Sequence, residues 1–338
     1  MTEPSAPEAR DDAANPPASP PTPRRPDLTT FTIEGRQAPA LFVVGWLATL
    51  VGGGLAGLTL AGISGPVGAI LWLVGLFLLG VGVVLLGGSQ AVERLAAGAA
   101  YAGPAPILVF IAVLAGSQLA GFVVGLPLSA VAGSIPRFVG DLLGVIVQAV
   151  VFIGVVRLMV VGPGALGWAE MGLRDRLADA GRAVLGGAAF AGPVVLATSV
   201  VAYAVVQVAG VTPASPLPPT GTTFGLLVNL LAGAVIAPVA EEILFRGFAL
   251  TAWRRSAGPR RAIIWSSIAF VLAHVLFVGG DTFGRAASLA FVAGAVRVPI
   301  ALTLGWLYVR TGSLWGPIGL HAAFNAILIV LGEVAATG

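Results

Sequence analysis

The sequence predicts an all-α fold: a polytopic bundle of about eight or nine transmembrane helices, with a disordered N-terminal tail. Hydrophobic residues make up 57% of the 338 residues and charged residues only 10%. The mean hydropathy of +0.97 lies well above that of an ordinary globular domain. The apolar residues also fall into successive runs of about 17 to 28 residues, and roughly 20 helical residues are needed to cross the hydrocarbon layer.

The composition limits the chemistry that the chain can perform. Cysteine is absent, which excludes disulfides, thiolate nucleophiles and cysteine-bound zinc. His274 and His321 are the only two histidines. All 18 basic residues are Arg, which we interpret as codon bias in a GC-rich bacterial genome. The basic character is therefore not a sign of nucleic-acid binding.

Residues 1–38 are expected to form a disordered, Pro-rich cytoplasmic tail. They show almost no apolar periodicity, so they bury too little surface to offset the entropy of ordering. The tail also lacks the basic, apolar and small-residue regions of a cleaved secretory signal. We therefore expect the first membrane span to act as an uncleaved anchor.

Nine spans, give or take one, are expected after the tail. Lipid offers no partner for unpaired backbone groups, so spans this apolar are best satisfied as helices. We place them at residues 40–62, 67–88, 105–132, 141–162, 183–210, 222–250, 261–278, 286–308 and 313–333.

The arginines between the spans predict a cytoplasmic N-terminus, because cytoplasmic loops carry an excess of basic residues. The outside loops then hold only Arg137 and Arg285. Within the connector after the fourth span, Trp168 to Arg182 is expected to lie along the cytoplasmic interface as an amphipathic helix. The inside segments hold Arg24, Arg25, Arg36, Arg94, Arg174, Arg176, Arg182, Arg254, Arg255, Arg260, Arg261 and Arg310.

Two adjacent carboxylates, Glu241 and Glu242, are the only acids expected well inside a span. A charge at that depth costs about 2.5–3.5 kcal/mol on insertion scales, so its default interpretation is a functional site facing the bundle interior. Glu242 and Arg246 are spaced i to i+4 and are expected to pair on one helix face. Glu241 points about 100° away and has no partner on its own helix. The bland alternative is an ion pair that only locks two helices together.

Both histidines are expected at the depth of these acids. Glu241 lies 13 residues before Arg254 and His274 lies 13 residues after Arg261, so on an antiparallel hairpin both lie about 20 Å below the arginines. His321 is about 16 Å deep by the same rise, and Asn325 follows one turn later on the same face. Each polar residue alone is more often a helix-to-helix hydrogen-bonding device than a catalyst. Arg157 and Arg297 also lie within apolar runs, where each can snorkel, pair with the site or mark a misplaced span end.

This set of residues is suited to amide hydrolysis. Glu241 with His274 can orient and deprotonate a water, and His321 with Asn325 can donate to the oxyanion of an attacked carbonyl. The sequence has no H-E-x-x-H, no G-x-S-x-G and no pair of deep aspartates, so the zinc-helix, serine and aspartyl designs lack support.

Three motifs resemble those of the CAAX prenyl protease and bacteriocin-processing (CPBP, or Abi) family of intramembrane endopeptidases. They are Glu241-Glu242-x-x-x-Arg246, Phe270-x-x-x-His274 and His321-x-x-x-Asn325. The resemblance covers about residues 222–330, and Met171-Gly172-Leu173-Arg174 is a weak echo of a segment that often precedes this core. It implies N-terminal transmembrane helices at 39–221 and a catalytic core at 222–333.

The resemblance also implies catalytic roles. The residue matching Glu241 activates water with His274, His321 and Asn325 form the oxyanion site, and Glu242 and Arg246 give structural and electrostatic support. The expected partners are the lipid bilayer and a peptide or membrane-protein substrate, lipidated at a C-terminal cysteine in eukaryotic relatives. We expect no cofactor, because Asn325 makes better sense as an oxyanion donor than as a ligand.

Three alternatives stay open at this point. Glu241, His274 and His321 can in principle bind zinc with water in the fourth position, which would make the protein a metalloprotease. A proton-coupled transporter would use the same groups as a relay, although no internal repeat is evident. A non-catalytic scaffold would bind a partner protein through the same fold.

Overall fold

A computed structural model describes residues 32–130, 132–174, 176–213, 215 and 217–337. The chain divides into two compact units, Met1–Arg36 and Gln37–Gly338. In the first unit the described residues form a turn in which Arg36 Nε donates a hydrogen bond to the Thr32 carbonyl at 2.6 Å. The disorder expected of the tail concerns mainly residues 1–31, which lie outside the described residues.

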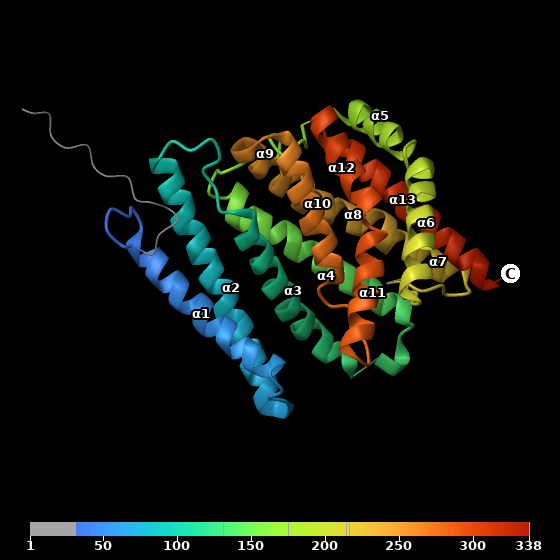
Figure 1. Ribbon diagram of the computed structural model, residues 1–338, viewed down its shortest axis with the longest axis horizontal. Coiled ribbons are helices and arrows are strands. Elements are labelled where there is room, and N and C mark those ends of the chain that lie inside the picture. Colours follow the sequence, from blue (N-terminus) through green and yellow to red (C-terminus); the bar gives the residue numbers. More distant parts are fainter. Residues whose placement is uncertain (1–31, 131, 175, 214, 216, 338) are drawn as a thin grey trace, which may run out of the picture. The chain divides into compact units, whose positions relative to one another are not determined.

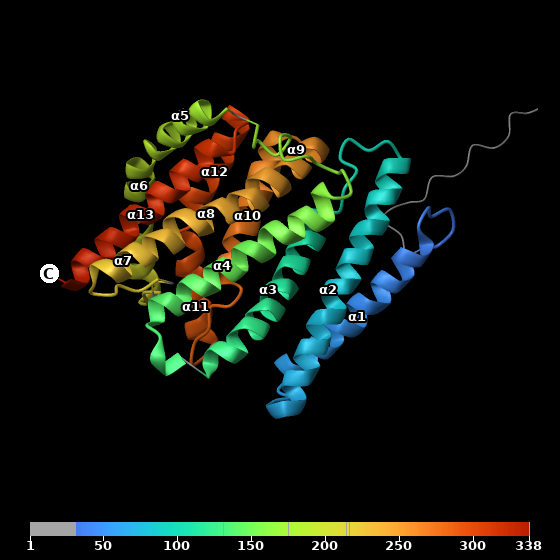
Figure 2. The ribbon, with the colours of Figure 1, turned by 180° about the vertical axis from the view of Figure 1, so that it is seen from behind.

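All regular structure in the described part of the chain is helical (Figures 1 and 2). Three π-helical segments, η2, η3 and η4, continue or interrupt longer α-helices, and η1 is a short 3₁₀ turn. The elements are α1 (Pro39–Leu60), α2 (Gly65–Ala96), α3 (Pro106–Ser129), η1 (Ala132–Ser134), α4 (Arg137–Val156), η2 (Arg157–Val161), α5 (Leu177–Ala188), α6 (Ala191–Ala209), α7 (Thr223–Leu230), η3 (Leu231–Ile236), α8 (Ala237–Glu242), η4 (Ile243–Leu250), α9 (Thr251–Ala257), α10 (Pro259–Val275), α11 (Phe283–Ala295), α12 (Val298–Thr311) and α13 (Trp315–Thr337).

Eight helical stretches among the described residues are long and apolar enough to cross a membrane. The predicted all-α, multi-pass fold is thereby confirmed. The seventh expected span, residues 261–278, corresponds to α10, whose 17 residues lie at the short end of the range that can cross the hydrocarbon core. The eight stretches are Pro39–Leu60, Gly65–Ala96, Pro106–Ser129, Arg137–Val161, Ala178–Ala209, Thr223–Ala257, Phe283–Thr311 and Trp315–Thr337.

The helices begin where the local sequence supplies a start signal. Proline stands in the first turn of α1, α2, α3, α10 and α12, where its missing N–H costs no hydrogen bond. Thr222 and Thr282 cap α7 and α11 by accepting hydrogen bonds from Gly225 N and Arg285 N.

Two buried carboxylates also accept hydrogen bonds from backbone N–H groups just before helices begin. Glu93 Oε1 accepts from Gln37 N at 2.7 Å, just before α1, and Glu333 accepts from Thr220 N at 2.9 Å, just before α7. Both residues are buried, and they lie three and four residues before the ends of α2 at Ala96 and α13 at Thr337. They therefore lie at span ends, and the expectation that only Glu241 and Glu242 lie well inside a span stays a prediction.

The connector after η2 also differs from the expectation. Residues 162–174 form turns, and helix begins only at Leu177, so the amphipathic helix expected from Trp168 was wrong over its first half. Gly172 has φ +87°, and its carbonyl accepts a hydrogen bond from Leu314 N at 3.0 Å. Arg255 Nη2 donates a hydrogen bond to Oε1 of the exposed Glu170 at 2.6 Å, and Gly167 N donates to its Oε2. These two hydrogen bonds lower the pKa of the Glu170 carboxyl from its ordinary value.

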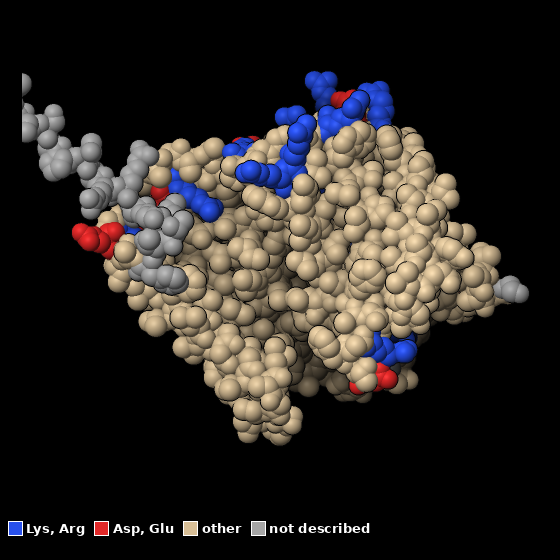
Figure 3. All heavy atoms as spheres, viewed as in Figure 1, with Lys and Arg blue, Asp and Glu red and all other residues tan. Residues whose placement is uncertain are grey.

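Within residues 37–338, α1 and α2 form an antiparallel pair, and α2, α3 and α4 contact each other in turn (Figure 1). Helices α8, α10, α12 and α13 lie together on the other side of α4 (Figure 2). The larger buried apolar cluster includes residues of α4, α8, η4 and α10. Arg side chains gather at one end of the helices, and most of the visible helical surface carries no charge (Figure 3). The expected division between N-terminal transmembrane helices at 39–221 and a catalytic core at 222–333 stays a prediction.

Candidate active site

The stretch Thr223–Ala257 carries the two central acids at an irregular part of its course. Helix α8, which ends at Glu242, lies between the π segments η3 and η4. A π segment places one extra residue in a turn and so rotates the side chains that follow it, and such segments occur frequently at functional sites. Glu241 and Glu242 therefore lie between two segments that each change the direction in which the following side chains point.

Glu242 is the centre of a fully buried ion network. Its Oε1 lies 2.8 Å from Arg246 Nη1 and 2.8 Å from His321 Nδ1, and the side chains of Glu242 and Arg246 are 0% exposed. The i to i+4 pair expected from the spacing is present. Arg246 Nη2 also donates to the Ala301 carbonyl at 3.3 Å, which ties η4 to α12. Charge neutralisation and hydrogen bonds together offset much of the desolvation cost of these groups.

Phe270 forms the apolar wall behind this network. The Arg246 guanidinium lies 4.5 Å from the centre of the Phe270 ring, a distance at which cation–π attraction operates. The same ring contacts His274 at 4.5 Å and His321 at 5.7 Å between ring centres. Phe270, the first residue of the motif that ends at His274, thus touches three of the site's polar groups.

Glu241 faces the two histidines instead of a partner on its own helix. Its Oε2 lies 3.8 Å from His274 Nε2 and 3.9 Å from His321 Nε2. The Oε2 atom is buried and accepts no hydrogen bond from any described residue. The side chain as a whole is 15% exposed, in contrast to the sealed Glu242. The structure thus brings together Glu241 on α8, His274 on α10 and His321 on α13.

The tautomers of both histidines follow from their second contacts. His274 Nδ1 lies 2.7 Å from the Phe270 carbonyl, which can only accept, so Nδ1 carries the proton. His321 Nδ1 likewise donates to the Glu242 carboxylate. When neutral, each imidazole therefore turns an unprotonated Nε2 toward Glu241 Oε2. The separations of 3.8 and 3.9 Å are too long for direct hydrogen bonds and suit a molecule held between the groups.

Asn325 has a different contact from the other three. It is half-buried, one turn beyond His321 on α13, and its Nδ2 donates to the Gly233 carbonyl of η3 at 2.8 Å. None of its described hydrogen bonds reaches Glu241, His274 or His321. One of the two Nδ2 hydrogens is used by this bond, and the second is left for another acceptor.

Arg297 lies at the junction of α11 and α12, close to the site. Its Nη1 donates to the Ala293 carbonyl at 2.6 Å, and its charge interacts with Glu241 and His274. The sequence left its role open among snorkelling, pairing and a span end. The break that it marks divides the stretch Phe283–Thr311 into two helices.

No group of three or more His, Cys, Asp or Glu side chains in the described part of the chain is arranged to hold a metal ion. Glu241 Oε2 and the two Nε2 atoms are nevertheless of the atom types that bind zinc, and both Nδ1–H groups are held by oxygen acceptors, as is usual for ligating histidines.

The fold and this interior site define the general class: a multi-pass helical membrane protein with a carboxylate and two imidazoles facing one another between its helices. Residues 223–327, about a third of the chain, match the family model described as Type II CAAX prenyl endopeptidase Rce1-like. The match confirms the resemblance to the CAAX protease family and supports an intramembrane protease of the CAAX type as the general activity. Comparisons with curated proteins and with solved structures gave no match.

Proposed function

We propose that the chain is an intramembrane endopeptidase that hydrolyses a peptide bond with a water activated by Glu241. The observation that supports this is the convergence of Glu241 Oε2 on His274 Nε2 and His321 Nε2, at 3.8 and 3.9 Å, within a family match that covers all three residues. A water between these acceptor atoms can donate one hydrogen to the carboxylate and one to an imidazole.

The proposed reaction proceeds by addition and elimination. The water oxygen forms a bond to the carbonyl carbon while its proton passes to Glu241, which acts as general base. The C–N bond then breaks, and the proton moves from Glu241 to the departing amine. Glu242 is unsuited to this role, because both Arg246 and His321 bond to its Oε1 and its side chain is sealed from solvent.

The oxyanion formed by the addition needs hydrogen-bond donors. For His321 to donate from Nε2, it must enter the reaction as an imidazolium that has taken a proton from solvent before the water attacks, and that it keeps throughout; the Glu242 carboxylate beside Nδ1 stabilises this cation. Asn325 supplies the Nδ2 hydrogen that does not bond Gly233. In this assignment Arg246 fixes Glu242, and Glu242 fixes the ring of His321.

The family description points to proteins with a prenylated C-terminal CAAX sequence as one substrate class. We propose a membrane-associated peptide of this general kind, with cleavage near a lipidated or membrane-embedded segment. The all-Arg composition supports a bacterial cell membrane as the location. The distribution of the arginines between the spans supports an N-terminus in the cytoplasm, and the site would then be approached from the cytoplasmic side.

A zinc-dependent reaction with the same residues is the second candidate. Its support is the atom types of Glu241 Oε2, His274 Nε2 and His321 Nε2, with the two imidazole nitrogens 3.8 and 3.9 Å from the carboxylate oxygen, although these groups are not arranged around a metal position. In that case the three side chains would hold the ion, and the ion would supply Lewis-acid activation of water. The proposed metal-free reaction and this alternative differ in their response to chelators.

The test is cleavage of two quenched fluorogenic peptides by purified protein in liposomes. One peptide carries a prenylated cysteine fourth from its carboxyl end, and the other is an unlipidated membrane-spanning peptide. We expect Glu241→Gln to lower kcat by roughly 10²–10⁴-fold, the usual range for loss of a general base. Glu170→Gln is the matched control, since Glu170 is an exposed carboxylate in the connector, and it should cleave like the wild type.

Three outcomes would count against the proposal. Wild-type activity in Glu241→Gln would make the glutamate mechanism wrong. Activity that a chelator abolishes and zinc restores would assign the reaction to a metalloenzyme. A folded wild-type protein that cleaves neither peptide would favour a scaffold or transporter.

A further inference from the structure

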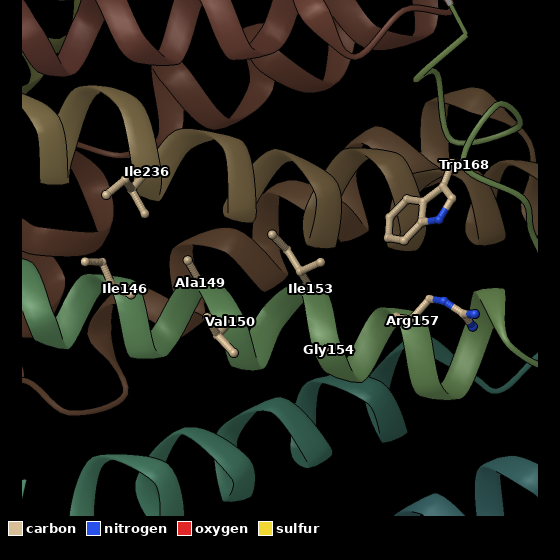
Figure 4. Close-up of a pocket in the computed structure, with 8 residues that line it drawn as sticks. All are labelled: Ile146, Ala149, Val150, Ile153, Gly154, Arg157, Trp168 and Ile236. Carbon is tan, nitrogen blue, oxygen red and sulfur yellow. The ribbon is translucent and has the colours of Figure 1, made fainter. Parts of the chain in front are cut away.

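A groove on the flank of α4 lies outside the site described above. It has a volume of about 650 Å³, within the usual range of ligand pockets. Its walls are apolar along most of their length, and only one end carries polar groups (Figure 4). The lining residues are Ile146, Ala149, Val150, Ile153, Gly154, Arg157, Trp168 and Ile236.

Arg157 is the charged group at the polar end. It stands where α4 passes into the π turn η2, and it is exposed, with no hydrogen bond or ion pair from its guanidinium to any described residue. An arginine within an apolar span is costly unless it reaches an anion or water. Arg137, at the other end of the same helix, is instead paired with Asp141 at 3.8 Å.

Trp168 stands beside Arg157 and comes from the connector after η2 (Figure 4). Tryptophan is enriched at the level of the lipid headgroups, where its ring is in contact with apolar chains and its N–H with polar groups. The pair therefore marks the headgroup level of the groove. The nearby connector holds further arginines, at positions 174 and 176.

The length of the groove fits one leaflet. Ile146 and Arg157 are 11 residues apart, which corresponds to about 16 Å along a helix. The hydrocarbon core of a bilayer is about 30 Å thick, so one leaflet contributes about 15 Å. An acyl chain whose headgroup lies at Arg157 would run alongside α4 to the region of Ile146.

We propose that this groove binds an anionic phospholipid, with its phosphate at Arg157 and Trp168 and one acyl chain along α4. Charge complementarity selects this occupant, since Arg157, the one cation among the lining residues, lies at the headgroup end and the remaining lining is apolar. Basic pockets between transmembrane helices are known binding sites for anionic headgroups. The inference does not depend on the catalytic role of Glu241.

The experiment is native mass spectrometry of the delipidated full-length protein with phosphatidylglycerol or phosphatidylcholine at equal concentrations. Wild type should bind phosphatidylglycerol preferentially. Arg157→Gln should lose about fivefold in phosphatidylglycerol affinity, as expected for one basic residue near a headgroup, while binding of phosphatidylcholine stays the same. Arg137→Gln removes the same charge from the same helix and should keep the preference.

A second variant tests the position of the acyl chain without changing charge. A Cβ added at Gly154 would meet no protein atom within 4 Å, and Gly154 lines the groove, so Gly154→Leu should fold normally while it fills the groove. It should reduce the binding of both lipids. The proposal is overturned if Arg157→Gln keeps the preference, if Arg137→Gln loses it equally, or if Gly154→Leu binds both lipids like wild type. Displacement of the phospholipid by a lipidated peptide substrate would assign the groove to the substrate and would also overturn it.

Discussion

Glu241 and Glu242 are adjacent in the chain, but their surroundings give them opposite properties. Glu242 has two charged or ionisable neighbours at 2.8 Å and no exposed surface. Each residue keeps one carboxylate oxygen without a described donor, but only the Glu241 side chain retains some exposure. The first arrangement fixes a charge in place, whereas the second leaves a carboxylate oxygen for a small molecule.

Removing one partner of the buried Glu242–Arg246 pair should lower the free energy of unfolding more than removing both. Arg246→Met leaves the Glu242 charge without its guanidinium, a loss of about 3–5 kcal/mol for a buried pair. The double variant Glu242→Gln with Arg246→Met should be closer to wild type. Thermal unfolding in detergent measures both. A double variant that is less stable than either single variant would contradict the assignment of this pair as a coupled unit.

Several site contacts followed from the sequence, and others did not. The spacing of Glu242 and Arg246 predicted their pairing, and the depths counted from the cytoplasmic arginines predicted that Glu241, His274 and His321 share one layer. The bond from His321 to Glu242 could not be foreseen, because it depends on the rotation of α13 and on the π segments around α8. The same holds for the contact of Asn325 with Gly233.

At the scale of elements, the position of α13 depends on its close packing against α5. Gly187 on α5 faces the Gly316 carbonyl of α13, and Gly319 faces the Val184 carbonyl of α5. Small residues at both places allow the two backbones to approach closely, which is a common device in membrane helix packing. Because α13 carries His321, this packing also helps to set the geometry of the site.

Two neighbouring glycines of α5 give a matched test of this packing. A Cβ at Gly187 would overlap the Gly316 backbone, whereas a Cβ at Gly186 would meet no protein atom within 4 Å. Gly187→Ala should therefore lower stability by about 1–3 kcal/mol, the usual cost of overpacking.

Gly186→Ala should be neutral or stabilising by up to about 1 kcal/mol, because alanine favours helix. Melting temperatures of the two variants, measured side by side, provide the comparison. Equal shifts would mean that α5 and α13 are not in close backbone contact.

The sequence predicted most elements within a few residues but failed at the connector before α5. The alternating charges of residues 168–182 suggested one amphipathic helix. Gly172, with its positive φ, and its bond to Leu314 instead make a turn that docks against the start of α13. Such a tertiary contact leaves no periodic signal. Met171 beside it is fully buried, which gives the weak Met171–Arg174 echo a packing role.

At the scale of the whole molecule, the direction of α10 decides the topology. If α10 crosses the membrane, the chain crosses nine times and its termini lie on opposite sides. With only the other eight stretches crossing, both termini lie on the same side. The 17 residues of α10 are just long enough, and its ends connect to α9 and α11.

Because the protein has no cysteine, single cysteines can report the topology without background. Ser256→Cys lies at the end of α9, and Asp281→Cys lies between α10 and α11. We expect a membrane-impermeant maleimide to label Asp281→Cys in whole expressing cells and to label Ser256→Cys only after the cells are opened. Labelling of both from the same side would show that α10 does not cross.

We propose that Glu241 and His274 act on one water as a unit. The most direct measurement is a double-mutant cycle on kcat with Glu241→Gln, His274→Ala and the double variant, each verified as folded by its melting temperature. Each single substitution should lower kcat by about 10²–10⁴-fold, and the double variant should be no slower than the slower single variant, as for residues that act together. Losses that multiply in the double variant would mean that the two residues act independently, and the account of the site would be wrong.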